Sequence, residues 1–339
     1  MTEERGNQNH LRGDGLLPVI QIEARTLAEG WHKAMIACYD KGARIETPKQ
    51  REDMTLGYDA DIIVRVSNPL EEPMRHKYGV YDDDRGIIQY ILEVTHGIHN
   101  HWKKNPDDPT DKRWGYTYNE RFVDQLPFVF QRIKADWDEK GRITGRDYQF
   151  TIWRAGEDII LEQGDPPCFQ RGHLRFLINN KGEIVLNYDT DWRSRCLAKA
   201  WNENTLAQAK LQKLLADKVS KLLGVPIKVG AYIDRSSSLH IYGKYIDEDN
   251  MAMMIETMKK KPLEELVERR YIEEDETYLK RLIYVQSLVE DAKQGTNLPA
   301  EELKKLGYDI NTIKYPEDWD SWPKSWDAEP DLSKLVRAP

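Results

Sequence analysis

Apolar residues recur at three- and four-residue intervals along several stretches of the chain, which is the spacing of one face of a helix. Six segments with this spacing are expected to be helices: residues 27–35, 84–96, 121–139, 197–223, 249–261 and 276–293. Thr26 stands where a helix N-cap is needed, and Gly97 and Gly224 stand where helices commonly end. The pattern therefore predicts a helix-rich chain with well-marked helix ends.

Short runs rich in β-branched and aromatic residues lie between these helices and are typical of strands. They cover residues 60–66, 148–153, 172–178, 183–188, 228–232 and 238–242. The segment Asn179-Asn180-Lys181-Gly182 separates two of the runs and is a hairpin turn signal. Helices and strands alternate, but not as regular strand–helix–strand units. We therefore predict an α+β fold rather than a doubly wound sheet.

The two ends of the chain differ from its middle. Residues 1–17 are polar and are expected to be a flexible leader, residues 18–248 to be the main domain, and residues 249–339 to be a helical extension with an acidic tail. That tail contains three tryptophans among acidic residues and prolines: Trp319, Trp322 and Trp326. The tail is either an arm pinned by its tryptophans or a partly disordered end, and the cost of solvating three indoles favours the arm.

Composition narrows the class of protein. The 339 residues are 40% hydrophobic and 32% charged, with a formal net charge of -8. No apolar run approaches the roughly 18 residues of a membrane span, and the N-terminus lacks the apolar core of a secretory signal. Three cysteines do not make a disulfide framework, so we expect a reducing cytoplasm. The acidic balance argues against nucleic acid as a partner but allows a small anionic ligand held by local arginines.

Cys168 is the strongest candidate for a nucleophile because it follows the rigid turn Pro166-Pro167 and precedes Arg171. A thiolate attacks electron-poor carbon well, and a nearby arginine lowers the pKa of a thiol. The ordinary alternative is a small buried hydrophobe, which is what most single cysteines are.

Arg193 and Arg195 flank Ser194, and the three together could hold a phosphate. Guanidinium groups match phosphate oxygens in pairs, and a serine hydroxyl adds a donor. An ordinary surface ion pair is the alternative. Since the chain has no glycine-rich phosphate loop, an arginine cluster would have to bind phosphate through side chains.

Other reactive residue types carry weaker hypotheses. His96, His99 and His101 are close in sequence but match no established metal spacing, and a helix end is the simpler reading. Cys168 and His240 could form a thiol–imidazole dyad, although only the residue types support it. Tyr116 and Tyr118 could stack on a heterocycle or belong to the core.

Four segments together resemble the active-site set of the folate-dependent thymidylate synthase family, with the archaeal-type branch most similar. Pro166-Pro167-Cys168 matches the nucleophile motif of that family, and Trp192-Arg193-Ser194-Arg195 matches its phosphate-binding motif. Asn204 stands where the family places the asparagine that reads the pyrimidine. Ser238-Leu239-His240-Ile241-Tyr242 matches the segment that holds the sugar hydroxyl. The resemblance runs over about residues 18–248.

The resemblance implies a fold in which helices pack a mixed sheet, and a reaction at C5 of a pyrimidine nucleoside monophosphate. Cys168 would add to C6 of the ring, Glu93 would act as general base, and Tyr118 joins the implied catalytic residues. The implied substrate-binding residues are Arg146, Arg193, Ser194, Arg195, Asn204, His240 and Tyr242. The implied co-substrate is 5,10-methylenetetrahydrofolate, and no metal is implied. Among the possible reactions, reductive methylation of dUMP to dTMP is the first choice.

The family is an obligate homodimer in which a sheet face forms the interface and partner arginines reach the phosphate. Arg146 lies seven residues before Trp153 and falls on one of that arginine pair, but its neighbour Asp147 does not match the second. The resemblance therefore implies a homodimer in which one expected arginine is missing.

Cys196 is the main departure from the family, which has aspartate at this position in contact with the pterin of the folate. Cysteine cannot accept the same charged hydrogen bonds. Two alternatives to dUMP methylation therefore stay open: hydroxymethyl transfer to dUMP, dCMP or CMP, and a nucleotide-binding protein without turnover. Asn204 favours a uracil ring, since the enzymes that hydroxymethylate deoxycytidylate are expected to carry aspartate at this position.

Overall fold

The structure is a computed structural model that describes residues 15–45, 56–105, 108, 111, 113, 115–160, 166–248, 250–293 and 298–335. Within these residues the strands form one sheet in the order β1-β3-β8-β6-β5-β4, with β2 beside β3 and β7 beside β8. The bounds are β1 Val19–Ala24, β2 Ala43–Ile45, β3 Gly57–Val66, β4 Gln149–Thr151, β5 Phe169–Ile178, β6 Ile184–Trp192, β7 Arg195–Cys196 and β8 Ile227–Ile241.

The sheet contains both parallel and antiparallel pairs. β1 runs parallel to β3, and β6 and β7 run parallel to β8. β3 and β8, β5 and β6, and β4 and β5 are antiparallel pairs. The predicted α+β class with a mixed sheet packed by helices is therefore confirmed.

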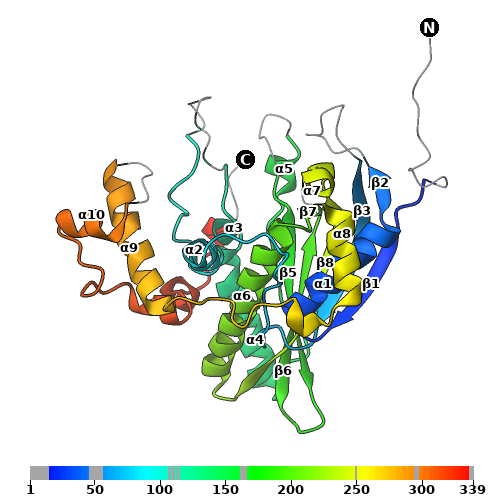
Figure 1. Ribbon diagram of the computed structural model, residues 1–339. Helices are drawn as coiled ribbons and strands as arrows, with labels where there is room; N and C mark the ends of the chain where they lie inside the picture. Colours follow the sequence, from blue (N-terminus) through cyan, green and yellow to red (C-terminus); the bar gives the residue numbers. More distant parts are fainter. Residues whose placement is uncertain are drawn as a thin grey trace.

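The helices lie in successive layers beside the sheet (Figure 1). Their bounds are α1 Leu27–Lys41, α2 Asp84–His96, α3 Tyr118–Phe122, α4 Leu126–Lys140, α5 Ala155–Asp158, α6 Ala200–Leu223, α7 Gly243–Glu248, α8 Met251–Lys260, α9 Glu276–Lys293 and α10 Ala300–Lys305. α1 and α6 pack on the sheet, and α4 packs beside α6. α2 covers α6, α8 covers α1, and α9 packs outside α2.

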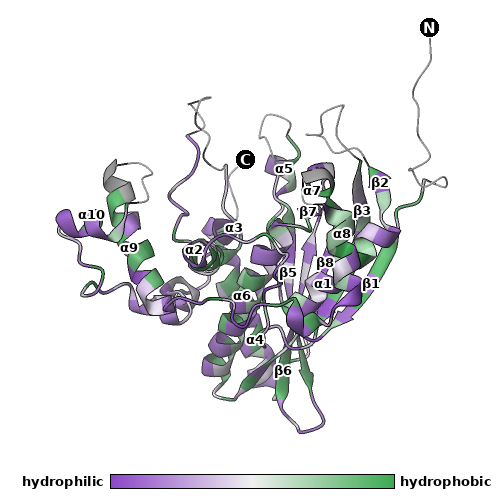
Figure 2. Cartoon of the chain, viewed as in Figure 1, coloured by the Kyte–Doolittle hydropathy of each residue, from purple (hydrophilic) through white to green (hydrophobic). Residues whose placement is uncertain are grey.

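Strand residues alternate between a buried and a more exposed face, as the period of two requires. In β1, Ile20 and Ile22 are buried while Val19 is 72% exposed. The buried side chains face the helices, where the apolar segments of Figure 2 converge. The opposite face carries charged pairs across neighbouring strands, such as Arg235 with Asp61 at 2.9 Å. The core therefore lies between the sheet and α1, α4 and α6.

The predicted helix ends are confirmed where a cap was recognised. The Thr26 hydroxyl accepts a hydrogen bond from the backbone of Glu29 at 3.3 Å. Gly97 and Gly224 end α2 and α6 with φ of 66° and 69°, a left-handed conformation that glycine adopts without a Cβ penalty. Helix limits were therefore readable wherever a cap residue marked them.

Three expected elements differ from the structure. The single helix over 121–139 is α3, a 3₁₀ turn and α4, because Pro127 in the first turn of α4 cannot donate to the preceding turn. The two strands at 228–232 and 238–242 are one strand, β8, whose polar middle pairs with both β3 and β6. The helix over 249–261 is α8, preceded by α7. β1 was not expected, and residues 1–14 of the proposed leader lie outside the described part of the chain.

The tryptophan-rich tail packs as an arm, as expected. Trp326 is 1% exposed and its ring lies 5.9 Å from that of Phe130 in α4, and Trp319 is also buried. Nε2 of His96, the last residue of α2, lies 2.9 Å from the backbone carbonyls of Asp318 and Ser321. The arm therefore contacts both α4 and the end of α2.

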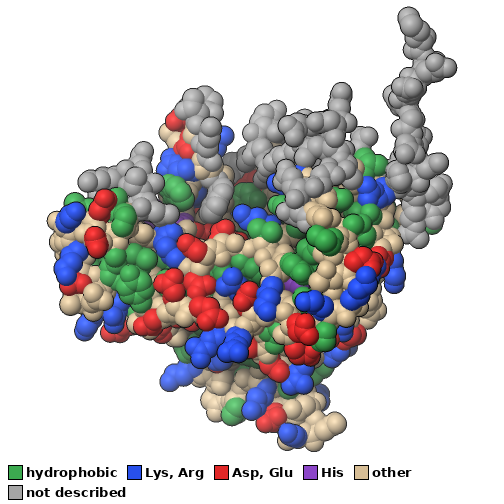
Figure 3. All heavy atoms as spheres, in the orientation of Figure 1, with side chains coloured by type: hydrophobic (Ala, Val, Ile, Leu, Met, Phe, Trp, Pro, Cys, Tyr) green, Lys and Arg blue, Asp and Glu red, His purple; other side chains and the backbone are tan. Residues whose placement is uncertain are grey.

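On the face drawn in Figure 3, acidic and basic side chains are interspersed around apolar spots. Among the described residues, none of the helices has the length and apolar character needed to cross a membrane.

Candidate active site

Cys168 and Arg193 lie side by side at the end of the β5–β6 pair. Phe169 pairs with Trp192, so the preceding and following residues also meet, and the Arg193 backbone donates to the Cys168 carbonyl at 2.8 Å. The Arg193 side chain donates from Nε to the Pro167 carbonyl at 3.0 Å and from Nη2 to the Pro166 carbonyl at 2.7 Å. The arginine thus holds the turn that presents Cys168.

These contacts use only part of the hydrogen-bonding capacity of Arg193. A guanidinium has five N–H donors, and two of them point at the proline carbonyls. Both Nη1 hydrogens and one on Nη2 have no partner among the described residues, and one from each nitrogen forms the outer edge that matches two oxygens of a phosphate. The half-buried Arg193 can therefore support the Cys168 turn and bind an anion at the same time.

Aromatic side chains surround Cys168. The Tyr118 ring, at the start of α3, meets Phe169 and Trp192 edge to face at 5.7 and 5.8 Å. Cys168 lies close enough to Tyr116 and Tyr118 for a charge on it to raise their pKa values, although burial is the larger cause of the rise in both. The nucleophile candidate therefore lies beside two neutral phenols.

Asn204 and Glu93 approach each other from two packed helices. In α6, Asn204 donates from Nδ2 to the Tyr90 hydroxyl at 2.5 Å. Tyr90 is three residues before Glu93 in α2, so both lie on one helix face. Glu93 Oε1 lies 2.7 Å from Nδ1 of His99 and accepts from Gln89 at 2.9 Å. Burial holds the pKa of Tyr90 well above its ordinary value.

Arg195 lies in the core instead of facing solvent. Its side chain is 1% exposed and is paired with Asp234, and it donates from Nη2 to Ser236 Oγ at 2.7 Å. The guanidinium lies 4.1 Å from the Trp192 ring centroid. Only Nη1 is without a partner among the described residues. A surface ion pair is therefore wrong for Arg195, and its main contacts are structural; Ser194 beside it is half-buried.

His240 lies near the end of β8, opposite Asp59 of β3 and Cys196 of β7. Its ring meets the Tyr242 ring edge to face at 4.5 Å. Nδ1 of His240 is 3.3 Å from Ser238 Oγ, which donates to Asp59 Oδ1 at 2.9 Å. Burial lowers the pKa of His240 to about 4 and raises that of Asp59 to about 6.

Cys196 precedes α6, and the backbone N–H groups of residues 198–200 point towards its sulfur. These donors act to lower the pKa of the thiol, but burial is the larger effect and the net pKa is raised. Cys196 therefore stays a neutral thiol at neutral pH, unlike the carboxylate that the resemblance places here.

Arg146 is exposed and does not join this group within one chain. It lies before the edge strand β4, and its carbonyl is 3.1 Å from Nε2 of His173. His173 is five residues beyond Cys168 along β5, so at about 3.3 Å per residue the two are well apart. Asp147 forms an ion pair with Arg132 at 3.0 Å.

Two weaker hypotheses receive no support. Among the described residues no three potential ligands lie close enough to hold a metal ion, since His96 contacts the C-terminal arm and His99 contacts Glu93. Cys168 and His240 adjoin strands β5 and β8, which β6 separates. Two strand spacings are about 10 Å, so a direct thiol–imidazole dyad is wrong.

Sequence reasoning missed several residues of the site. Tyr90 could have been found from its helical spacing to Glu93. Glu203, beside Asn204, accepts from the Asp82 backbone at 2.7 Å, and burial raises its pKa. Asp59 and Asp234 carried no motif: strand pairing brings Asp59 to His240 of β8, and Asp234 of β8 pairs with Arg195.

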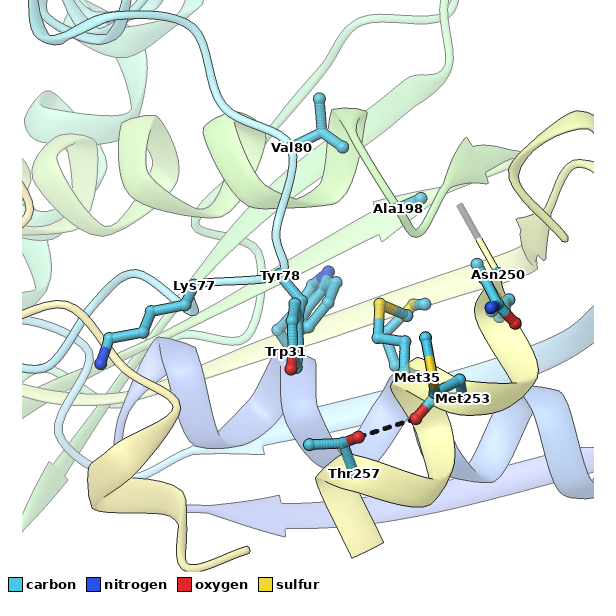
Figure 4. Close-up of a pocket in the computed structure, with 11 residues that line it drawn as sticks. Trp31, Met35, Lys77, Tyr78, Val80, Ala198, Asn250, Met253 and Thr257 are labelled. Atoms are coloured by element: carbon cyan, nitrogen blue, oxygen red, sulfur yellow. Dashed lines mark hydrogen bonds between the residues drawn. The ribbon is translucent and has the colours of Figure 1, made fainter. Parts of the chain in front are cut away.

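A separate cavity of about 430 Å³ lies between α1, residues 77–80 and α8 (Figure 4). Its walls include Trp31, Met35 and Met253, and Ala198 closes one side. Ala198 lies two residues after Cys196, so the cavity adjoins the turn before α6. Of the proposed site residues, none lines it.

Comparison with protein-family models found no match, and no curated protein matches the sequence. Among solved structures, the fold is similar to that of thermostable thymidylate synthase A from Bacillus subtilis, with a TM-score of 0.45 and 14% identity over 68% of this chain and 84% of that chain. This is a partial similarity of fold, and substrate and reaction have to be argued from the site itself.

Proposed function

We propose that this protein is an enzyme that transfers a one-carbon unit to C5 of a pyrimidine nucleoside monophosphate, with dUMP to dTMP as the first choice. The observation that carries the proposal is the pairing of Cys168 with Arg193. One turn presents a thiol, and the arginine that holds this turn has N–H donors left for an anion within the described part of the chain. A reaction on a nucleotide needs a nucleophile and, close to it, hydrogen-bond donors that hold the phosphate.

The ring and the sugar of the nucleotide would meet different elements. Asn204 donates one Nδ2 hydrogen to Tyr90, which leaves its Oδ1 for N3–H of uracil and its second Nδ2 hydrogen for O4. His240 and Tyr242, in edge-to-face contact, would receive the sugar. Arg193 and Ser194 would hold the phosphate, with Arg195 supporting them from the core.

The chemistry begins when the Cys168 thiolate adds to C6 of the ring. The electron pair of the C5–C6 double bond moves into the ring carbonyl as an enolate, so C5 becomes nucleophilic and attacks the one-carbon unit. Glu93 would then remove the C5 proton through water while its Oε1 is held by His99 and Gln89. Loss of tetrahydrofolate would then leave an exocyclic methylene on C5, which takes hydride from tetrahydrofolate to give the methyl group and dihydrofolate, or takes water to give the hydroxymethyl group. Elimination of the thiolate restores the double bond. Tyr118 would border the reacting ring.

The one-carbon donor is a co-substrate, for which 5,10-methylenetetrahydrofolate is the proposal, and no metal takes part. Cys196 stands at the position that would face its pterin, and as a neutral buried thiol it cannot replace a carboxylate there. A pterin that is bound less tightly would let water reach the transferred one-carbon unit. Hydroxymethyl transfer is therefore the second candidate, and nucleotide binding without turnover is the third.

Assembly completes the proposal. Arg146 is exposed beside an edge strand and remote from Cys168 of its own chain, so we propose that it serves the phosphate of a second subunit in a homodimer. The charged open face of the sheet would be the self-complementary interface.

The test uses dUMP tritiated at C5 together with methylenetetrahydrofolate. Release of tritium to water supports one-carbon transfer, and the mass of the nucleotide separates methyl from hydroxymethyl product. Binding of dUMP without tritium release would favour the non-catalytic candidate. Absence of dUMP binding would refute the proposed function.

A further inference from the structure

Asp59 and Ser238, to which the proposed function gives no role, form a chain of hydrogen bonds with His240. Ser238 Oγ donates to Asp59 Oδ1 at 2.9 Å and lies 3.3 Å from Nδ1 of His240. Asp59 and His240 are direct cross-strand partners in β3 and β8. All three side chains come from strands, so the chain is held by the sheet rather than by a loop.

The number of hydrogens that Asp59, Ser238 and His240 carry decides which atom donates in each of these hydrogen bonds. An ionised carboxylate only accepts, so the single hydroxyl hydrogen of Ser238 is committed to Asp59. Ser238 Oγ can then only accept from the imidazole, which places the proton of neutral His240 on Nδ1. The Ser238 carbonyl is a further acceptor for the ring. Nε2 is left with a lone pair.

Nε2 of His240 is buried without a partner. His240 is 6% exposed, and no described residue hydrogen-bonds to this nitrogen. An unsatisfied buried polar atom costs about 1–3 kcal/mol, so it calls for a partner that the described residues do not supply. Since the atom is an acceptor, the missing partner is a donor.

We propose that Asp59 is a positioning residue that acts through Ser238 to hold His240 as the Nδ1–H tautomer, so that Nε2 selects a ligand hydroxyl. This rests on the proposed function, under which the donor is the 3′-hydroxyl of the nucleotide sugar. The site then distinguishes a sugar with this hydroxyl from one that lacks it, and Asp59 contributes to that choice without touching the ligand.

The chain reverses when Asp59 takes up one proton. Asp59 then donates to Ser238, Ser238 donates to Nδ1 of His240, and the ring proton resides on Nε2, which becomes a donor. The groups that face the pair are Asp61 on β3, Cys38 on α1 and Cys196 on β7. Burial, and to a lesser extent Asp61, raises the pKa of Asp59, while its hydrogen bond from Ser238 acts to lower that pKa. The reversal is therefore centred near pH 6.

The first experiment reads the tautomer without any ligand, so its result is independent of the proposed function. Ring nitrogen shifts of ¹⁵N-histidine at pH 7.5, assigned with His240→Gln, should show His240 protonated at Nδ1. Ser238→Ala should raise the fraction of His240 protonated at Nε2, because only the backbone carbonyl of residue 238 then accepts from Nδ1. Ser238→Thr should restore the wild-type fraction, and the exposed neighbour Ser237→Ala should resemble wild type. Wild-type His240 protonated at Nε2 would overturn the proposal.

The second experiment measures Kd for dUMP and for 2′,3′-dideoxyuridine 5′-monophosphate by calorimetry. Wild type and Ser237→Ala should prefer dUMP by about three- to tenfold, and Ser238→Ala should show a smaller preference, because its imidazole is no longer oriented by the Ser238 hydroxyl. A preference that Ser238→Ala leaves unchanged would overturn the role of the chain in recognition. Failure of wild type to bind either nucleotide refutes the proposed function and this hydroxyl assignment, whereas the tautomer result stands separately.

Discussion

Arg193 donates a hydrogen bond from Nη2 to the backbone carbonyl of Pro166 across 2.7 Å. This contact joins the two halves of the proposed chemistry, because the turn that carries Cys168 is held by the side chain that would bind phosphate. Arrival of an anion on the free edge of Arg193 is therefore coupled to the position of the nucleophile. The predictions below separate these roles.

Cys168→Ser should abolish tritium release from dUMP while leaving Kd for dUMP within about threefold of wild type. Serine keeps the turn and the Arg193 contacts, which involve backbone carbonyls, but its hydroxyl is a far weaker nucleophile than a thiolate. Calorimetry and the tritium assay measure the two properties. A serine variant with near-wild-type turnover would show that Cys168 is not the nucleophile.

Arg193→Ala should weaken dUMP binding by about 1.5–3 kcal/mol, since hydrogen bonds to a charged group are lost. Deoxyuridine, which has no phosphate, should be affected much less. Arg25→Ala is the matched control because Arg25 is exposed and pairs with Glu71 away from the site. Equal losses for nucleotide and nucleoside would mean that Arg193 acts only through the proline turn.

Asn204→Asp should shift kcat/KM from dUMP towards dCMP, because a carboxylate accepts from the 4-amino group of cytosine. Tyr90→Phe should lower the discrimination without reversing it, since the Tyr90 hydroxyl orients the Asn204 amide. Competition assays with both nucleotides measure the ratio. If neither substitution changes it, Asn204 does not read the ring.

Chains carrying Arg146→Ala and Cys168→Ser should each be inactive alone and regain up to one working site when mixed as a heterodimer. Arg146 is exposed and lies away from Cys168 of the same chain, so its effect must come from a partner. Light scattering at micromolar concentration should report a dimer. A monomer, or mixed chains without activity, would contradict the shared site.

Asp59→Asn should be more stable than wild type above pH 6, by up to about 2–3 kcal/mol, and the gain should vanish below pH 4. The folded-state pKa of Asp59 is raised to about 6 from about 4 unfolded, so its contribution to stability is lost as pH rises through that window. Urea unfolding between pH 4 and 8 measures the difference.

The stability of His240→Gln relative to wild type should change with pH in the opposite direction to that of Asp59→Asn. The folded-state pKa of His240 is lowered to about 4, so wild type loses stability as pH falls below about 6.5 and the glutamine variant does not. The gain of His240→Gln over wild type should therefore grow with falling pH, while that of Asp59→Asn shrinks. A pH-independent difference for either variant would show that the residue keeps its ordinary pKa in the folded state.

Local signals in the sequence were enough to predict much of the fold. The limits of α2 and α9 agree with the expected 84–96 and 276–293, and Gly97 ends α2 because a helix stop depends on neighbouring residues alone. The sequence also indicated Cys168, Arg193, Asn204 and His240 as site residues. Their roles stay predictions, but the structure brings Cys168 and Arg193 into direct contact.

Only the tertiary structure decided what each of these residues contacts. Arg193 and Arg195 are two positions apart and look equivalent in the sequence, yet one holds the turn before Cys168 and the other is paired with Asp234 in the core. The partner of each comes from a segment distant in sequence, and no local spacing encodes it. Likewise, Asp59 meets His240 only because β3 pairs with β8. Helix ends are set by interactions within a few residues, whereas burial, proton position and pKa are set by strand pairing between residues more than a hundred positions apart, such as Asp59 and Ser238.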